Sequence, residues 1–265
     1  MVGDIATDIL TVYSGPLAVD SDTAAQVRIT GGGSAANTAA WLVQAGVDSV
    51  LSGVVGDDDA GAARIAELRA AGVRCAVRRV PGASTGSVVV LSSGTARSML
   101  CDRGANALLD PSDVDAGLPA AHLHLSAYSL FDPRSAPAGE HALRTARALG
   151  MTCSVDAGSA APLARFGRAR FLDLVRAADV LFANLDDAGL HRSFERQQAL
   201  AVLDANAQRG AALKQLIVAG VEQAVFLQAA PAQRGGANGR RENALAREVC
   251  AIESQFDFAL QRHPR

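Results

Sequence analysis

The amino-acid sequence predicts an α/β protein in which a mostly parallel sheet is covered by helices on both faces. Strands alternate with helices of about ten residues between residues 121 and 190, a pattern typical of parallel sheets. Of the 265 residues, 49% are apolar and only 4% are aromatic, so we expect a core of Ala, Val and Leu. This length suits one domain with a large core.

The first ten residues read as the end of a buried strand that runs into a polar turn. Asp8 lies there between apolar neighbours, which suits either a turn cap or an inward-pointing carboxylate. Residues 11–30 contain Gly15-Pro16 and then a period-two segment at 26–30. This alternation favours half-exposed strands over core strands.

Three consecutive glycines, Gly31, Gly32 and Gly33, open a run of good helix formers that ends at Gly46. Glycine allows close approach to the main chain, and a helix start presents free N–H donors and a positive dipole end. Asn37 lies in the first turns of this helix, with an amide that both donates and accepts. The segment therefore suits hydroxyls or anions; a tight loop before a packed helix is the structural alternative.

The same order of strand, turn and helix continues through the middle of the chain. We expect these elements in turn: a strand at 47–56, a helix at 60–71, a strand at 73–80, and a hairpin from 85–91 to 96–101. The acidic triplet 57–59 caps the helix and complements its dipole. Arg103 follows in a polar turn, where it is either a functional cation or half of a surface ion pair.

The second half predicts strands at 122–126, 152–156 and 180–184, and helices at 138–149 and 171–178. Ligands of parallel sheets lie at the carboxyl ends of the strands. Four polar positions follow expected strand ends, namely Asp8, Asp102-Arg103, Asp156 and Asn184. His122 and His124 share one face of their strand, but no third metal ligand is spaced near them, so packing histidines are favoured.

Charge and cysteine usage argue against several classes of protein. The net charge of −2 gives no argument for a nucleic-acid or membrane partner. Lys214 is the only lysine and follows no glycine loop, which excludes the phosphate loop GxxxxGK[ST]. The four cysteines form no CxxC pair and predict neither a zinc site nor a disulfide framework. Without a leader-like start or an apolar run of about 18 residues, we expect a cytoplasmic protein.

Asp8, the Gly32-Gly33 turn, Asn37, Gly46 and Gly56 together resemble the first signature of the ribokinase family (PfkB carbohydrate kinases). Further matches follow in family order at 102–106, 123–126, 155–156 and 184–187. The resemblance covers residues 1 to 227. It implies a single ribokinase-like domain with a small β lid at about 11–30 and 84–101, which excludes water from the reacting phosphate.

The resemblance also implies an activity and a substrate site. Family members transfer the γ-phosphoryl group of ATP to a hydroxymethyl group of a sugar, a nucleoside or a similar small alcohol. By this resemblance we expect Asp8, Gly32, Gly33, Asn37 and Arg103 to bind the substrate. We also expect a homodimer through the lid, because exposed lid edges often pair between subunits.

The nucleotide side of the resemblance lies later in the chain. Asn184, Asp187 and Gly220 are expected to bind the nucleotide, with Mg²⁺ as the second cofactor. Asp187 resembles a family Glu that orients Mg²⁺ through water, and is one methylene shorter.

The C-terminal end departs from the family pattern. The family's Gly-Ala-Gly-Asp segment holds the moving phosphoryl group and supplies the base, and the nearest segment here is 234–239. Asn238 cannot accept a proton at neutral pH, so no catalytic residue is identified. We expect the loss of the base and of the segment that holds the phosphoryl group to remove roughly several kcal/mol of transition-state stabilisation. We expect residues 229–265 to be a divergent tail that arose from a frameshift or truncation, and the short first strand suggests a misplaced start.

Three functions stay open from the sequence. The first is an ATP-dependent kinase of the ribokinase type, and the second is a non-catalytic sugar- or nucleotide-binding remnant of that family. The third is a dinucleotide-dependent oxidoreductase, which needs G-x-G-x-x-G directly after the first strand. The three glycines come later than that, and position 36 is alanine, so this third function is disfavoured.

Overall fold

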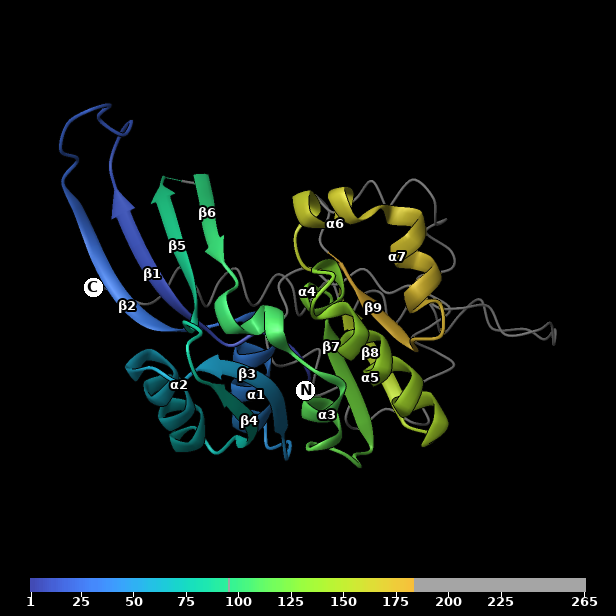
Figure 1. Ribbon diagram of the computed structural model, residues 1–265. Helices are drawn as coiled ribbons and strands as arrows, with labels where there is room; N and C mark the ends of the chain where they lie inside the picture. The colour runs from blue at the N-terminus through green and yellow to red at the C-terminus, as the bar shows by residue number, and fades with distance from the viewer. Residues whose placement is uncertain (95, 184–265) are drawn as a thin grey trace, which may run out of the picture.

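The computed structural model describes residues 1–94 and 96–183, which form a central parallel sheet and a separate outer sheet (Figure 1). The strands of the central sheet are β3 (Val50–Gly56), β4 (Arg74–Val80), β7 (His122–Ser126), β8 (Thr152–Asp156) and β9 (Val180–Phe182). β3 pairs with β4, and β8 pairs with both β7 and β9, all in parallel register.

Val2 joins the two halves of the central sheet. It bridges Ser52 of β3 on one side and Leu125 of β7 on the other, both in parallel register. Its backbone N–H donates to the His124 carbonyl at 2.9 Å, and its carbonyl accepts from the Ser126 N–H at 3.0 Å. The start of the chain therefore lies in the middle of the sheet (Figure 1).

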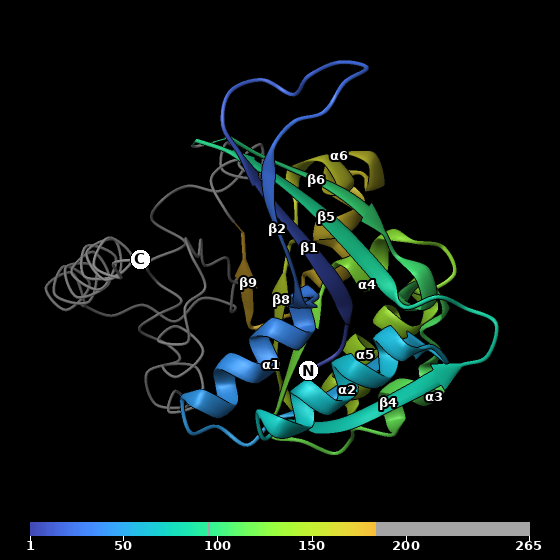
Figure 2. The ribbon, with the colours of Figure 1, turned by 90° about the vertical axis from the view of Figure 1, so that its left-hand side faces the viewer.

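Side chains alternate along β3 between two cores, one on each face of the central sheet. Leu51 and Val55 pack with Ile65, whereas Val54 packs on the other side with Leu125. The helices α1 (Ser34–Gln44) and α2 (Asp59–Ala70) contact the sheet on the first face, and α3 (Pro111–Asp115) and α5 (Ala136–Ala148) contact it on the second (Figure 2). This confirms the predicted α/β class with helices on both faces.

Four short elements complete the described part of the chain. They are a 3₁₀ helix η1 (Gly104–Leu108) and the helices α4 (Tyr128–Phe131), α6 (Ala160–Phe166) and α7 (Arg168–Val175). The helix expected at 171–178 therefore begins three residues earlier, because Gly167, at φ +99°, ends α6 and starts α7 directly.

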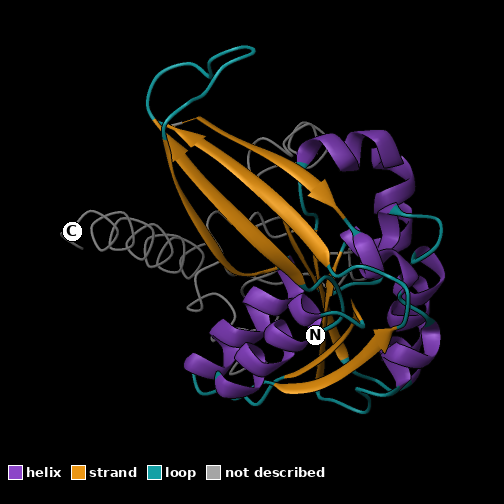
Figure 3. Cartoon of the chain, turned by 60° about the vertical axis from the view of Figure 1, so that its left-hand side comes forward, coloured by secondary structure: helices purple, strands orange, loops and turns teal. Residues whose placement is uncertain are grey.

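The outer sheet has the strand order β2-β1-β5-β6 and extends beyond the helices, with α1 in contact with β2 and α2 in contact with β1 (Figure 3). Its strands are β1 (Ala6–Tyr13), β2 (Ala25–Gly32), β5 (Gly86–Ser93) and β6 (Ala96–Asp102). Strands β2, β5 and β6 overlap the segments 11–30 and 84–101 that were expected to form the lid, whereas β1 begins earlier, at Ala6. The role of this sheet as a lid stays a prediction. One face carries the row Thr30, Asp8, Val88, Cys101, and the opposite face carries the row Ile29, Ile9, Val89, Leu100.

That opposite face exposes large apolar side chains, with Ile29 at 70% and Leu100 at 63% exposure. The homodimer expected through the lid stays a prediction.

The polar turn expected around Asp8 is wrong. Strand β1 runs through Asp8 without a break, from Ala6 to Tyr13, because Gly32 on the neighbouring strand leaves space for the carboxyl group. Asp8 therefore does not follow a strand end, whereas Asp102 and Asp156 are the last residues of β6 and β8. Asn184 and the tail at 229–265 lie outside the described residues.

Within the described part of the chain, no helix has the length and apolar character that crossing a membrane would require.

Asp58 ties helix α2 to the start of β5. It is the N-cap of α2, where its Oδ1 accepts from Gly61 N–H at 2.8 Å, and its other oxygen accepts from Thr85 N–H at 2.8 Å. The Thr85 hydroxyl donates to the same carboxylate at 2.5 Å. Burial alone would raise the pKa of Asp58, but the hydrogen bonds from Thr85 and Gly61 lower it.

We expect Asp58→Ala to lower the free energy of unfolding by about 1–2 kcal/mol at neutral pH, since it removes a cap and leaves Thr85 N–H without its acceptor. Because the pKa of Asp58 is lowered in the folded state, this contribution is present above the unfolded-state pKa and is lost as the pH falls through the folded-state value. Urea unfolding at neutral and acid pH measures both effects. Asp59→Ala, on the exposed first turn of the same helix, is the control and should cost less than about 0.5 kcal/mol.

Candidate functional site

All three glycines before α1 are packed against oxygen atoms, Gly31 only against the flexible end of Glu67. A Cβ on Gly32 would overlap the carboxyl group of Asp8, and a Cβ on Gly33 would overlap the carbonyl oxygen of Asp4. Gly33 also has φ +101°, a conformation that L side chains rarely adopt. The segment therefore passes between two oxygen-bearing groups with no space for a side chain.

Asp8 is held in this contact without a polar partner. Asp8 lies in β1, opposite Thr30 of β2 and Val88 of β5. Within residues 1–94 and 96–183 its carboxylate has no hydrogen bond or ion pair to another group. Burial raises the pKa of Asp8, and the charges of Arg97 and Arg64 oppose this rise. An ionised carboxylate only accepts hydrogen bonds, so Asp8 is suited to hydroxyl donors from a ligand.

The start of α1 is the second part of the site. Gly33 is the N-cap, and no side chain caps the helix. The Ser34 hydroxyl donates to Asp156 Oδ2 at 2.9 Å, which connects α1 to the carboxyl end of β8. Asn37 is exposed one turn later on the same side as Ser34, and its side-chain amide has no partner within the described chain. The structure thus puts Asp8 against Gly32, and places Gly33 at the start of α1 with Asn37 in its first turns.

Further polar groups lie at the carboxyl end of β8, namely Asp156, which the sequence indicated, and Tyr128 and Ser159, which it did not. Asp156 Oδ1 accepts from Gly158 N–H at 3.0 Å, and Tyr128 and Ser159 share a hydroxyl–hydroxyl bond of 2.6 Å. Burial raises the pKa of Tyr128, as do the charges of Asp156, Cys101 and Asp4. Tyr128 therefore lies between β8 and the Asp8 face of the outer sheet. An aromatic residue two positions after a predicted strand was its only signal in the sequence.

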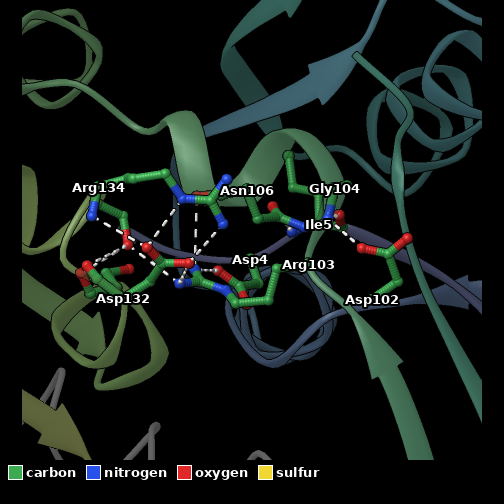
Figure 4. A network of polar contacts seen from close by, with 10 residues as sticks. Asp4, Ile5, Asp102, Arg103, Gly104, Asn106, Asp132 and Arg134 are labelled. Atoms are coloured by element: carbon green, nitrogen blue, oxygen red, sulfur yellow. Dashed lines mark hydrogen bonds and ion pairs between the residues drawn. The ribbon is translucent and has the colours of Figure 1, made fainter.

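Arg103, expected to bind substrate, is engaged in an internal network (Figure 4). Its Nη2 donates to Asp4 Oδ1 at 2.7 Å, and its Nη1 donates to the Ser135 hydroxyl at 3.1 Å. Asp132 lies 3.9 Å from the same guanidinium and also pairs with Arg134 at 2.8 Å. The Arg103 side chain is only 21% exposed, so the ion pair is internal and not a surface pair. Its substrate contact stays a prediction.

The same network holds the chain just before Asp8. Burial raises the pKa of Asp4, and Arg103 opposes this rise by its charge and its hydrogen bond. The side-chain amide of Asn106 pairs with the backbone of Ile5 in both directions, at 2.9 Å from the Ile5 N–H and at 2.8 Å to the Ile5 carbonyl. These contacts place residues 4 and 5, and with them the start of β1, against η1.

The two histidines of β7 are internal. His122 bonds to Thr152 and Ser154, and His124 bonds to the same Ser154 hydroxyl, each at 2.8 Å. Burial lowers the pKa of His122 to about 4 and that of His124 to about 3, so both rings are neutral at physiological pH. In the described chain no group of three or more His, Cys, Asp or Glu residues could hold a metal ion.

The predicted nucleotide residues Asn184, Asp187 and Gly220 lie outside the described residues, as does the predicted magnesium contact of Asp187. The described site is therefore the part that was predicted to bind the substrate.

We expect Gly32→Ala to lower the free energy of unfolding by about 1–3 kcal/mol, because the new methyl group meets the whole Asp8 carboxyl group. The neighbouring Gly31→Ala is the matched control. Its Cβ would lie 2.8 Å from Oε2 of Glu67, the far end of a flexible and exposed side chain, so the cost should stay below about 1 kcal/mol. Urea unfolding measures both variants.

A double variant isolates the contact. In an Asp8→Ala background the overlap is gone, and Gly32→Ala should then cost no more than Gly31→Ala. Equal costs for Gly32→Ala with and without Asp8 would contradict the assignment.

Comparison with known proteins bears on this geometry. The model of the pfkB family carbohydrate kinase matches residues 1–233 of the chain. An ATP-dependent ribose-1-phosphate kinase from Halopiger xanaduensis is 37% identical over 161 residues, which are 59% of this chain and 51% of that relative. The chain thus spans about half the length of the curated relative it matches.

Solved structures share the fold. The adenosine kinase of Sinorhizobium meliloti is 25% identical and superposes with a TM-score of 0.63 over 89% of this chain and 79% of that chain. An uncharacterized sugar kinase of Pyrococcus horikoshii in complex with ATP has a TM-score of 0.63 at 22% identity, over 72% of this chain and 65% of that chain. The family match and the glycine turn beside Asp8 lead to one assignment: the chain belongs to the pfkB family of carbohydrate kinases.

Proposed function

We propose that this chain binds a sugar or nucleoside at Asp8 and the glycine turn, as part of an ATP-dependent kinase that phosphorylates a hydroxymethyl group. The names of the matched relatives, a ribose-1-phosphate kinase and an adenosine kinase, support this substrate range.

The unpartnered Asp8 carboxylate is the observation that carries the proposal. A half-buried carboxylate without a hydrogen bond is costly unless a ligand supplies the donors. Vicinal hydroxyls of a sugar are such donors, and the amide of Asn37 can donate to or accept from a third hydroxyl. The free N–H groups at the start of α1 add further donors.

We propose the outer sheet as the lid over this ligand. Asp8 and Cys101 belong to one row across β1, β5 and β6, and this face lies toward Tyr128 on the central half. Closure of such a sheet would exclude water from the transfer and strengthen the hydrogen bonds to Asp8.

ATP and Mg²⁺ are the proposed cofactors, to be held by Asn184, Asp187 and Gly220. When bound, Mg²⁺ supplies charge neutralisation for phosphoryl transfer. The described residues contribute binding and orientation of the acceptor hydroxyl, and exclusion of water. In the family pattern, the base at the acceptor hydroxyl comes from the segment that corresponds to residues 234–239. Here that segment has the amide of Asn238 in place of a carboxylate.

This missing carboxylate favours a second candidate, a non-catalytic binding protein with the same site. It would use Asp8, the glycine turn and Asn37 to bind the sugar or nucleoside without transferring phosphate.

A turnover assay distinguishes the two candidates. ADP release is measured with ribose 1-phosphate, ribose, fructose and adenosine, together with thermal shifts for each ligand. Turnover with one of them is expected, and Asp8→Asn should raise its KM about 10- to 100-fold, because hydrogen bonds to a charged acceptor are lost. Asp22→Asn, in the exposed loop between β1 and β2, is the control and should change KM less than twofold, roughly. Thermal shifts without turnover would favour the binding protein. If no ligand gives a thermal shift or turnover, both candidates are overturned.

Two arginines favour a phosphorylated sugar among these substrates. Arg28 of β2 and Arg97 of β6 lie on the Asp8 face of the outer sheet, and neither is paired with a carboxylate in the described chain. Arg97 lies near enough to affect the pKa of Asp8. A guanidinium that lacks an internal anion is suited to a phosphate group.

We expect Arg97→Gln to raise the KM for ribose 1-phosphate about tenfold and to leave the KM for an unphosphorylated substrate unchanged. Arg147→Gln, an exposed arginine in the last turn of α5, is the control. Steady-state kinetics on both substrates measure the difference. Equal effects on both substrates would remove the assignment of Arg97 to the phosphate.

A further inference from the structure

Arg64 on helix α2 is a buried cation that the proposed function does not use. Its side chain is only 9% exposed, and its Nη2 donates to Oε1 of Glu67 at 2.5 Å. Its Nε and Nη1 are buried and have no hydrogen-bond partner in the described chain. Buried polar groups are almost always satisfied, so an arginine with two unsatisfied nitrogens requires a reason.

Arg64 lies directly behind the glycine turn. A Cβ on Gly31 would be 3.9 Å from Arg64 Nε and 3.8 Å from its Cδ. Thr7 of β1 is opposite Gly31, and its hydroxyl is also buried and unpartnered. Gly31 and Thr7 therefore mark the face of the outer sheet against which Arg64 is packed.

Asp8 occupies the other face of the same segment. Successive residues of a strand point to opposite faces, and the Asp8 carboxyl group contacts Gly32 where Arg64 contacts Gly31. The peptide that links Gly31 to Gly32 therefore lies between the Asp8 carboxylate and the Arg64 guanidinium. A Cβ at position 32 would overlap the Asp8 carboxyl group, whereas a Cβ at position 31 would lie at ordinary contact distance from Arg64.

The other charged groups around Asp8 are more exposed than Arg64. Arg97 and Cys101 face it from β6 and are exposed, and Asp4 lies before β1 in its own pair with Arg103. Arg97 opposes the rise in the pKa of Asp8 more than Arg64 does, but its charge is exposed to solvent and to screening by salt. Arg64 is sealed between α2 and the sheet, where a charge acts over a longer range.

We propose that Arg64 is a positioning residue for the substrate site, which keeps the Asp8 carboxylate ionised from behind the Gly31-Gly32 peptide. Its free Nε and Nη1 leave its charge incompletely neutralised by Glu67, so part of its field reaches Asp8. The effect on substrate binding rests on the proposed function, whereas the effect on Asp8 itself does not.

The first test therefore uses the full chain without substrate. The ¹³Cγ resonance of Asp8, assigned by its loss in Asp8→Asn, is followed from pH 3 to 8. In Arg64→Met the titration midpoint should move to higher pH, because a cation that favours the ionised form is gone. Arg64→Lys should restore most of the wild-type midpoint, and Arg69→Met, an exposed arginine on the same helix, should leave it unchanged.

Glu67→Gln provides the opposite test and removes only an exposed carboxylate. Without Glu67 the charge of Arg64 is less neutralised, so the Asp8 midpoint should move to lower pH. A midpoint that stays at the wild-type value in both Arg64→Met and Glu67→Gln would overturn the proposal, even if the kinase activity is confirmed.

The second test measures substrate binding. At pH 5 the KM of Arg64→Met should rise about five- to tenfold, and at pH 8 it should change less than about twofold, since Asp8 is then ionised in both proteins. In an Asp8→Asn background Arg64→Met should have no further effect. The Tm should not fall, because two unsatisfied buried nitrogens are removed. A lower Tm with equal KM changes at both pH values would show that Arg64 is only structural.

Discussion

The contact between the Asp8 carboxyl group and Gly32 is the constraint on which the rest of the site depends. It requires glycine at position 32, a continuous strand through Asp8, and a second glycine at 33 to let the chain turn past Asp4 into α1. These requirements place the Asp8 carboxyl group against Gly32, and Gly32 is followed directly by the N-cap of α1, so the carboxylate lies near the free N–H groups of the helix. The site is a consequence of close backbone packing, and the side chains that surround it contribute orientation.

Much of the remaining polar structure serves to hold that contact in place. Arg103 fixes Asp4, Asn106 fixes Ile5, and Asp58 fixes the start of β5, the strand that pairs with β1. Arg103 and Asn106 lie in the segment that leads from the outer sheet back to the central half, and Asp58 lies between β3 and α2. Partly buried ion pairs add little net stability, but breaking one leaves an uncompensated charge. Their contribution is therefore best understood as a specific placement of β1 relative to α1.

The regular strands and helices were predicted from the sequence, and the errors lie where close packing between distant residues determines the structure. Strands 122–126 and 152–156 were predicted with the bounds that the structure shows, because each is a short, almost continuously buried strand of a parallel sheet that is covered by helices. Asp8 was read as part of a turn, since a charged residue among apolar ones is atypical of a strand and the compensating glycine lies 24 positions away. Tyr128 could not be found because its role depends on Gly158 and Ser159, which follow a different strand.

Burial alone does not mark a functional group here. His122 and His124 are buried, yet the hydroxyls of Thr152 and Ser154 bond to both ring nitrogens of His122 and to Nδ1 of His124, and the lowered pKa values keep both rings neutral. Asp8 is less buried and has no partner, and the Asn37 amide is likewise free within the described chain. A carboxylate and an amide that are both open near the start of one helix suit a ligand with hydroxyl groups, because hydroxyls donate to the carboxylate and pair with the amide in either direction.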